Sequence, residues 1–289
     1  MQRSLLMKKT KVVIATVAAI AAAVSLSGCV APENENGVTG GDTGIFAPDE
    51  NLPETPVLPE ETPPSPEEKP VIPQPPKPKT VTYLNVTADG VNIRSGAGTN
   101  YGVKGAAEKS TMYALNGQTD GWYKTGYKNG SAYISSKYCK EIEMLASDDG
   151  RVEAVIAEGT KLLGTTYVYG ATRYHDGNGK LLSGFKTSAF DCSSLMQYIF
   201  YKGAGVNLQL TTRTQIYQGK TVTKSQLKRG DLMFFTNETR KDNVGVERVG
   251  HVALFLGDNW ILHTASDYAK IEQISSKRWS YFIQGQRIL

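Results

Sequence analysis

One cysteine and two histidines in the second half of the chain have the types and spacing that nucleophilic catalysis needs. Cys192 opens an apolar, helix-like run in FDCSSLM, and His251 and His263 lie on two apolar segments joined by Gly257-Asp258-Asn259. The first turn of a helix favours a thiolate, so we expect a lowered pKa for Cys192. If the apolar segments pair, twelve residues of separation place both imidazoles on one face, directly or diagonally opposite. One imidazole can then take the thiol proton while the other orients it.

These side chains require a helix packed against paired strands. The spacing of apolar residues predicts helices over 151–164 and 194–201 and strands over 232–235, 249–256 and 260–264. Asp148 or Asp149 is the expected N-cap of the first helix. A polar, Gly-rich stretch at 172–188 separates that helix from Cys192, and we expect His175 within it to be exposed. This succession of elements indicates an α+β domain.

The segments DCSSL, TTRTQIY, RGDLMFF, GHVALFLG and HTA, in this order, resemble an NlpC/P60 cysteine peptidase domain over residues 148–289. The resemblance implies a papain-like fold, in which the cysteine helix packs on an antiparallel sheet. It implies cleavage of peptidoglycan stem peptides, commonly between γ-D-Glu and a diamino acid. It further implies that Cys192 is the nucleophile, that His251 is the general base and that His263 orients His251.

The same resemblance implies roles for three residues near the nucleophile. The hydroxyl of Tyr167 can join the Cys192 backbone N–H in binding the oxyanion. Asp191 and Ser193 flank the nucleophile and are expected to hold the substrate, and in some family members the aspartate binds a free N-terminal L-Ala amine. The alternative for Asp191 is that it only caps the helix. Two histidines on a hairpin and a cysteine at a helix start fit zinc-ligand spacing poorly, so no metal and no cofactor is expected.

The sequence departs from the family pattern at several positions. Thr166, Thr212 and Arg229 stand where the family often has proline, and the stretch 172–189 is longer than usual. None of these changes removes a catalytic group. We interpret the long stretch as a lid or a specificity loop.

Residues 81–143 have the pattern of a small all-β module. Short alternating runs predict strands over 91–93, 111–115, 122–127 and 131–134, with a hairpin turn at Asn129-Gly130. The segments Asn92-Ile93-Arg94-Ser95-Gly96 and Gly121-Trp122-Tyr123-Lys124 resemble a bacterial SH3 (SH3b) domain, a small SH3-like barrel. The resemblance implies cell-wall peptide binding or a part in shaping the adjoining active site. A passive structural module is the alternative.

The first eighty residues have the composition of an export signal and a tether. Residues 1–28 combine a basic start with an apolar run of 13 residues, which is too short to span a membrane and suits a signal peptide. The signal ends in Leu26-Ser27-Gly28-Cys29, which resembles a bacterial lipobox and predicts lipidation of Cys29; an ordinary secretory signal is the alternative. Residues 29–80 contain all 13 prolines of the chain and predict a disordered, extended tether.

The charge distribution excludes several classes of protein. The chain has 32 basic and 28 acidic residues, but residues 29–80 hold ten acids and three bases, so it is not a uniformly basic nucleic-acid binder. The apolar patterning beyond residue 80 excludes a wholly disordered chain. Three cysteines in 289 residues exclude a disulfide scaffold.

These observations predict an exported cysteine endopeptidase, lipid-anchored to the bacterial membrane and facing the cell wall or periplasm. Its expected partners are peptidoglycan stem peptides, with the membrane reached only through the lipid, with no nucleic acid, and with the protein as a monomer. Cys192 would cleave the stem through a thioester intermediate. The alternatives are a related papain-like cell-wall amidase or acyltransferase and a non-catalytic wall-binding lipoprotein built on the SH3b module.

Overall fold

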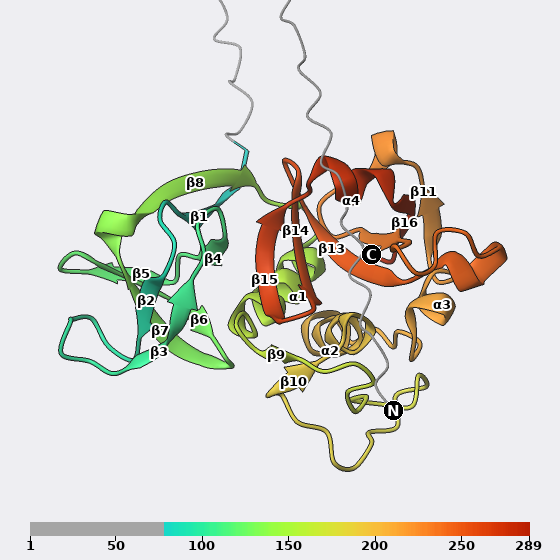
Figure 1. Cartoon of the computed structure of the whole chain (residues 1–289), viewed down its shortest axis with the longest axis horizontal. Coiled ribbons are helices and arrows are strands. Elements are labelled where there is room, and N and C mark those ends of the chain that lie inside the picture. The colour runs from blue at the N-terminus through green and yellow to red at the C-terminus, as the bar shows by residue number, and fades with distance from the viewer. Residues whose placement is uncertain (1–77) are drawn as a thin grey trace, which may run out of the picture. The chain divides into compact units, whose positions relative to one another are not determined.

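The computed structural model describes residues 78–289, which form a small β module followed by a mixed α/β domain (Figure 1). The predicted signal peptide at 1–28, the lipidation site at Cys29 and the tether up to residue 77 lie outside the described residues. Within residues 78–289, no helix is both long and apolar enough to cross a membrane.

The β module consists of two antiparallel sheets that enclose a common core. One sheet has the strand order β4-β1-β8 and the other β3-β2-β7-β6-β5. Leu84, Ile93, Met112 and Ile134 are completely buried between them. The strands are β1 (Thr80–Val86), β2 (Val91–Arg94), β3 (Val103–Ala107), β4 (Met112–Ala114), β5 (Gly117–Thr119), β6 (Trp122–Tyr127), β7 (Gly130–Ser135) and β8 (Cys139–Leu145).

The four predicted strands of this module are present, but its hairpin turn is displaced by one residue. Tyr127 pairs with Gly130, so the central turn residues are Lys128 and Asn129 rather than Asn129 and Gly130. Both have positive φ, 49° and 58°, as a type I′ turn requires. Strands β1 and β8 pair along their whole length, with Thr80 opposite Leu145. The module therefore extends slightly beyond the predicted 81–143.

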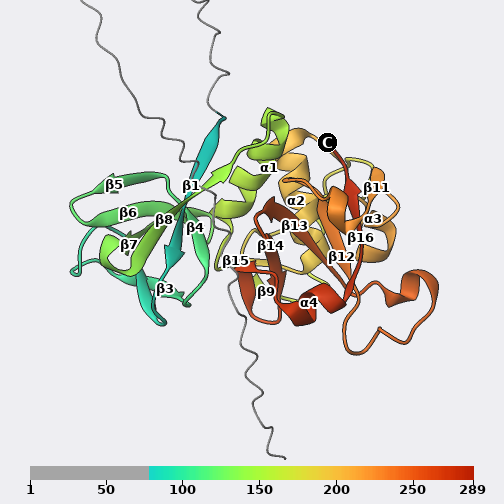
Figure 2. The same ribbon diagram turned by 90° about the horizontal axis from the view of Figure 1, so that it is seen from above.

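The second domain is built on an eight-stranded sheet with the order β10-β9-β15-β14-β13-β12-β16-β11. Figure 2 shows α1 and α2 side by side against this sheet. The strands are β9 (Thr166–Tyr167), β10 (Ala189–Phe190), β11 (Lys220–Val222), β12 (Leu232–Phe235), β13 (His251–Gly257), β14 (Trp260–Ala265), β15 (Tyr268–Gln273) and β16 (Phe282–Arg287). The helices are α1 (Gly150–Lys161), α2 (Cys192–Ala204), α3 (Thr212–Gln215) and α4 (Ser276–Ser280).

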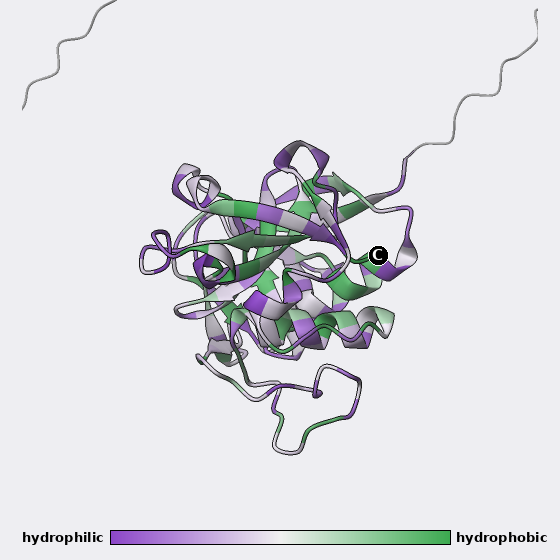
Figure 3. Cartoon of the chain, turned by 90° about the vertical axis from the view of Figure 1, so that its right-hand side faces the viewer, coloured by the Kyte–Doolittle hydropathy of each residue, from purple (hydrophilic) through white to green (hydrophobic). Residues whose placement is uncertain are grey.

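The central strands of this sheet are buried on both faces. Alternate residues of β12 point to opposite sides: Leu232 and Phe234 join the main core under α1 and α2, while Met233 and Phe235 join a second cluster with Trp279 at the α4 side. This explains why β12 reads as an uninterrupted apolar run, LMFF, rather than as an alternating pattern. In Figure 3 the hydrophobic residues gather in these inner elements and the hydrophilic ones on the outlying loops.

Helices α1 and α2 pack closely because small residues lie at their contact. A Cβ atom on Gly203 would stand 2.5 Å from the backbone N and Cα of Val155, a distance that only glycine permits. Helix α1 is N-capped by Asp149, one of the two predicted caps, whose side chain accepts a hydrogen bond from the Arg151 N–H. The second helix begins at Cys192 and ends at Ala204, so it extends beyond the predicted 194–201 at both ends.

The β module is joined to the second domain by backbone hydrogen bonds and by one buried arginine. The N–H groups of Lys128 and Asn129 donate to the carbonyls of Leu163 and Lys161, so the β6–β7 turn satisfies the C-terminal end of α1. Arg229, one of the departures from the family pattern, binds the Glu153 carboxylate at 2.7 and 2.8 Å.

The same guanidinium reaches both sides of the junction. Arg229 donates to the Leu256 carbonyl at the end of β13 and to the hydroxyl of Tyr83 on β1, each at 2.8 Å, and its side chain is only 7% exposed. A proline at this position could make none of these bonds. The substitution therefore ties β1, α1 and β13 together.

Candidate active site

The two imidazoles that the hairpin spacing predicted to share a face do meet. Strands β13 and β14 pair with Leu254 opposite Leu262, which places His251 and His263 diagonally on one face. His251 Nε2 lies 3.0 Å from His263 Nδ1. Both rings are buried. The geometry that the spacing of twelve residues predicted is therefore present, in its diagonal form.

A carboxylate continues this chain of hydrogen bonds. Glu272 on β15 places Oε1 3.0 Å from His263 Nε2, and Arg278 of α4 donates to the same oxygen at 3.0 Å. Glu272 was not predicted from the sequence, because strand β15 was not expected. A third strand after HTA, paired so that His263 faces Lys270, would have placed Glu272 two positions away on the same face.

Glu272 fixes the protonation pattern of both rings. The pKa of Glu272 falls to about 2: burial raises it, but the hydrogen bond and charge of His263, with the charges of Arg278 and Lys270, outweigh burial. An ionised carboxylate only accepts hydrogen bonds, so His263 must donate from Nε2 and accept at Nδ1. His251 must then donate from Nε2, which leaves its Nδ1 as the basic nitrogen.

Both histidines are neutral at neutral pH. Burial lowers the pKa of His251 well below 6.5, and the charges of His263 and Arg278 lower it further. Burial also lowers the pKa of His263, against the opposing effect of the hydrogen bond that His263 donates to Glu272. Neutral imidazole is the form that can accept a thiol proton.

Cys192 is the first residue of α2 and is 8% exposed. Burial, followed by the charge of Asp191, raises its pKa to about 12, although the N–H groups of Val252 and Ser193 and the charge of Arg173 act in the opposite direction. The expectation of a lowered pKa is therefore wrong, because burial outweighs the helix terminus. The Cys192 side chain is therefore a neutral thiol, and its sulfur lies by the backbone N–H of Val252, the residue that follows His251 in β13.

Tyr167 is positioned by a short parallel ladder between β9 and β10. Phe190 pairs with Tyr167, which brings the tyrosine beside the start of α2. Burial and the nearby charges of Cys192 and Asp191 raise the pKa of Tyr167, so its hydroxyl keeps its proton. The phenolic O–H of Tyr167 and the Cys192 backbone N–H are thus the predicted pair of donors for an oxyanion, a role that stays a prediction.

Comparison with known proteins agrees with this arrangement. Residues 164–287 match the NlpC/P60 family and residues 89–140 match the bacterial SH3 domain. Residues 164–287 form an NlpC/P60 domain. It follows a bacterial SH3 domain, and the fold is the α+β arrangement predicted, with the cysteine helix packed on a mostly antiparallel sheet.

Relatives of the NlpC/P60 domain are named as endopeptidases. The peptidoglycan DL-endopeptidase CwlO of Bacillus licheniformis is 31% identical over 49% of this chain and 29% of its own length. The probable endopeptidase NlpC homolog of Haemophilus influenzae is 32% identical over 45% of this chain and 64% of its own. The chain thus spans less than two thirds of either relative.

A solved structure is also similar to part of the chain. The peptidoglycan hydrolase RipB of Mycobacterium tuberculosis is 27% identical, with a TM-score of 0.38, over 48% of this chain and 65% of its own.

Two clefts lie at the predicted catalytic residues of the NlpC/P60 domain. One, of about 150 Å³, is lined by Cys192, Asp191 and three arginines, Arg173, Arg213 and Arg240. The other, of about 370 Å³, is lined by His251, Phe235 and Arg278. Tyr167 and Gly250 line both clefts, so the cleft beside Cys192 and the cleft beside His251 adjoin each other.

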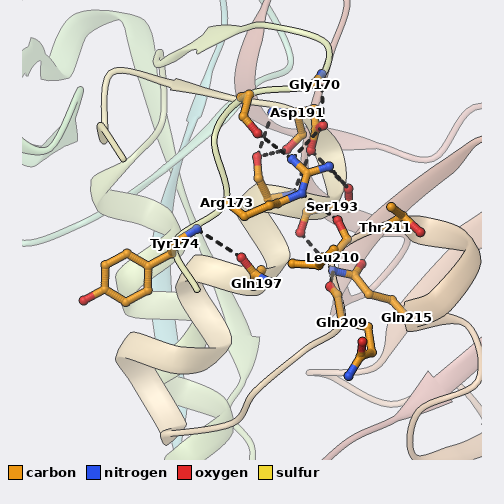
Figure 4. Close-up of polar contacts among 12 residues, drawn as sticks. Gly170, Arg173, Tyr174, Asp191, Ser193, Gln197, Gln209, Leu210, Thr211 and Gln215 are labelled. Atoms are coloured by element: carbon orange, nitrogen blue, oxygen red, sulfur yellow. Dashed lines mark hydrogen bonds and ion pairs between the residues drawn. The ribbon is translucent and has the colours of Figure 1, made fainter. Parts of the chain in front are cut away.

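Asp191 and Ser193 line the smaller cleft beside Cys192, but both are buried and hydrogen-bonded within the protein. Asp191 is the N-cap of α2 and accepts from the Ser194 N–H at 2.8 Å. Ser193 Oγ donates to Asp191 Oδ1 at 3.1 Å and accepts from Arg173. The capping alternative for Asp191 is thus observed, and a substrate role for either side chain stays a prediction (Figure 4).

The long insertion packs against α2 rather than hanging free. Tyr174 at its start contacts Phe185, Tyr198 and Tyr201 edge to face, and its backbone N–H donates to Gln197. His175 is completely buried, so the prediction that it is exposed is wrong. The glycine-rich composition indicated a loop correctly but did not indicate the aromatic cluster beneath it.

Proposed function

We propose that this chain is a cysteine endopeptidase that cleaves peptidoglycan stem peptides between γ-D-Glu and the diamino acid. The observation that carries the proposal is the chain of hydrogen bonds from Glu272 through His263 to His251, with Cys192 at the adjoining helix start and two clefts that adjoin each other. The name of the CwlO relative, a DL-endopeptidase, supports the type of bond. A pure wall-binding protein would have no use for this arrangement.

The first half of the proposed reaction makes a thioester. The Cys192 thiol gives its proton to His251 Nδ1 as its sulfur attacks the scissile carbonyl carbon. The carbonyl electron pair moves to the oxygen, which accepts hydrogen bonds from the Cys192 N–H and the Tyr167 hydroxyl. When the C=O bond re-forms, the C–N bond breaks and the amine leaves with the proton held by His251.

The second half regenerates the enzyme. His251 takes a proton from water, and the resulting hydroxide oxygen attacks the thioester carbon. The C–S bond breaks, the sulfur recovers the proton from His251, and the γ-D-Glu carboxyl group is released. His263 holds His251 in the Nε2–H tautomer throughout, with Glu272 as the final acceptor.

Product analysis tests the proposed bond specificity. Purified sacculi digested with the protein should release fragments that end in a free γ-D-Glu carboxyl group, with new amino groups on the diamino acid, detected by mass spectrometry. The products also decide between diaminopimelate and Lys in the stem. Release of intact stems from the glycan would instead identify an amidase, transfer without hydrolysis an acyltransferase, and binding without cleavage a wall-binding protein.

We further propose that the mature protein is exported and lipid-anchored at Cys29, which follows an apolar run and small residues. A C29A variant should lose incorporation of an alkyne-labelled fatty acid and move from the detergent phase to the aqueous phase in Triton X-114 partitioning. C139A, at the start of β8, is the matched control and should keep the label. Unchanged labelling of the Cys29 variant would contradict the anchor.

A further inference from the structure

An arginine of the insertion occupies the floor of the smaller cleft. Arg173 Nη1 donates to Asp191 Oδ2 at 2.9 Å and to the Ala171 carbonyl at 2.7 Å. Its Nε donates to the Leu210 carbonyl at 2.6 Å and its Nη2 to Ser193 Oγ at 3.2 Å. Figure 4 shows the guanidinium between Asp191, Ser193 and the backbone around Leu210. Because two backbone carbonyls and two side chains hold it, this charge has a fixed position.

Asp191 has no acceptor position left for a substrate. Its Oδ2 accepts from Arg173 and from the Gly170 N–H at 3.2 Å, and its Oδ1 accepts from Ser193 Oγ at 3.1 Å and the Ser194 N–H at 2.8 Å. A carboxylate offers about four lone-pair positions, so all are used. The side chain is 6% exposed. An aspartate that could otherwise bind a substrate ammonium is therefore already neutralised by this chain's own guanidinium.

The charges around the cleft add to this effect. Arg213 and Arg240 also line it, and both pair with one carboxylate, Glu247, at 3.5 and 3.3 Å. The three guanidinium groups that line the cleft are therefore paired with only two carboxylates, those of Asp191 and Glu247. A cationic group that enters the cleft gains no free carboxylate and meets a net positive field.

We propose that Arg173 is a specificity-determining residue that rejects a free amino end and selects stem peptides whose amino end is acylated as an amide. This inference rests on the proposed function and names its substrate class: stems still joined to glycan rather than freed peptides. An amide nitrogen carries no charge and needs no carboxylate. Arg173 acts by occupying Asp191 and by repelling an ammonium group.

A matched pair of peptides tests this selection. The tripeptide L-Ala-γ-D-Glu-diamino acid is supplied with a free or an acetylated amino end, each with diaminopimelate and with Lys, and kcat/KM is measured for both. At pH 7 the wild-type protein should prefer the acetylated peptide by about tenfold or more. An α-amino group loses its proton near pH 8, so the preference should fall to about threefold or less at pH 9.5. Because the same enzyme cleaves both peptides, pH effects on the enzyme itself cancel in the ratio of the two kcat/KM values.

Two variants assign the selection to Arg173. R173Q should bring the ratio close to one by raising kcat/KM for the free peptide, whereas R213Q removes a charge from the same cleft without touching Asp191 and should keep most of the preference. Thermal unfolding checks that both variants are folded, and if R173Q is not, the wild-type ratio and its pH dependence decide.

The outcomes separate this inference from the proposed function. Equal cleavage of both wild-type substrates, or faster cleavage of the free peptide, overturns the selection while the endopeptidase function stands. If folded R173Q keeps the preference for the acetylated peptide, the role of Arg173 is overturned. The same holds if R213Q loses that preference to the same extent as R173Q. Failure to cleave either peptide, together with intact sacculi, overturns both proposals.

Discussion

Replacement of Cys192 by alanine should reduce the release of stem-peptide fragments by about 10⁴-fold or more. Without the sulfur no thioester forms, and His251 has no thiol from which to take a proton. The clefts and Tyr167 remain, so binding of the stem peptide should persist. The measurement is fragment release from sacculi and kcat/KM on a synthetic stem peptide, with peptide binding to the C192A variant followed by calorimetry.

The fold should tolerate this change. Cys192 is the first residue of α2, where alanine is an acceptable helix residue, and the substitution removes one buried atom. We expect the free energy of unfolding to change by about 1 kcal/mol or less. C139A is the matched control, since Cys139 lies in the SH3 module and lines neither cleft, and it should retain full activity. Cleavage by C192A at the wild-type rate would exclude the thioester mechanism.

The part of the site that depends on local geometry was predictable from the sequence. An even separation of twelve residues places His251 and His263 on one face when the two apolar segments pair as Leu254 does with Leu262. The β-bulge between Phe255 and Gly257, which sets this register after Gly257 has paired with Trp260, was not predicted. The start of α2 at Cys192 is local in the same sense, because Asp191 caps it. These features depend on residues close together in the chain.

The features that depend on tertiary packing were not predictable in this way. Glu272 reaches His263 only because β15 pairs with β14, and the SH3 module supports that strand through a β-bridge between Thr111 and Glu272. Arg173 reaches Asp191 because the insertion folds back over α2. The pKa of Cys192 follows its burial, which only the assembled domain determines.

In the SH3 module, too, some strands were predictable from the sequence and others were not. Strands with alternating apolar residues, such as β6, were predicted, whereas β3 (VKGAA) and β5 (GQT) have little strand propensity of their own. They form because a neighbour offers hydrogen-bonding partners: β2 pairs with β3 and β6 with β5. Edge strands of this kind have no pattern to detect.

Replacement of His263 by leucine should lower kcat by about 10³-fold with little change in KM. Leucine fills a similar volume but cannot accept the Nε2–H of His251, so neither the tautomer nor the orientation of the base is held. E272Q should be milder, about tenfold to a hundredfold, because glutamine keeps an acceptor for His263 but loses the charge.

The pH profile of kcat/KM distinguishes positioning from loss of structure. His251 must be unprotonated to act, and burial lowers its pKa well below 6.5, so wild-type activity should persist below pH 6.5 and decline only as His251 gains a proton. His251 and His263 share a hydrogen bond and take up a proton as a coupled pair, and the hydrogen bond to Glu272 raises the pKa of His263 within that pair. E272Q loses this contribution, so the pair takes up its proton at lower pH, and the acid limb should move to lower pH as the plateau drops. A merely structural role for Glu272 would lower the plateau and leave the limb in place, and an E272Q profile that matches wild type in both respects would remove Glu272 from the relay.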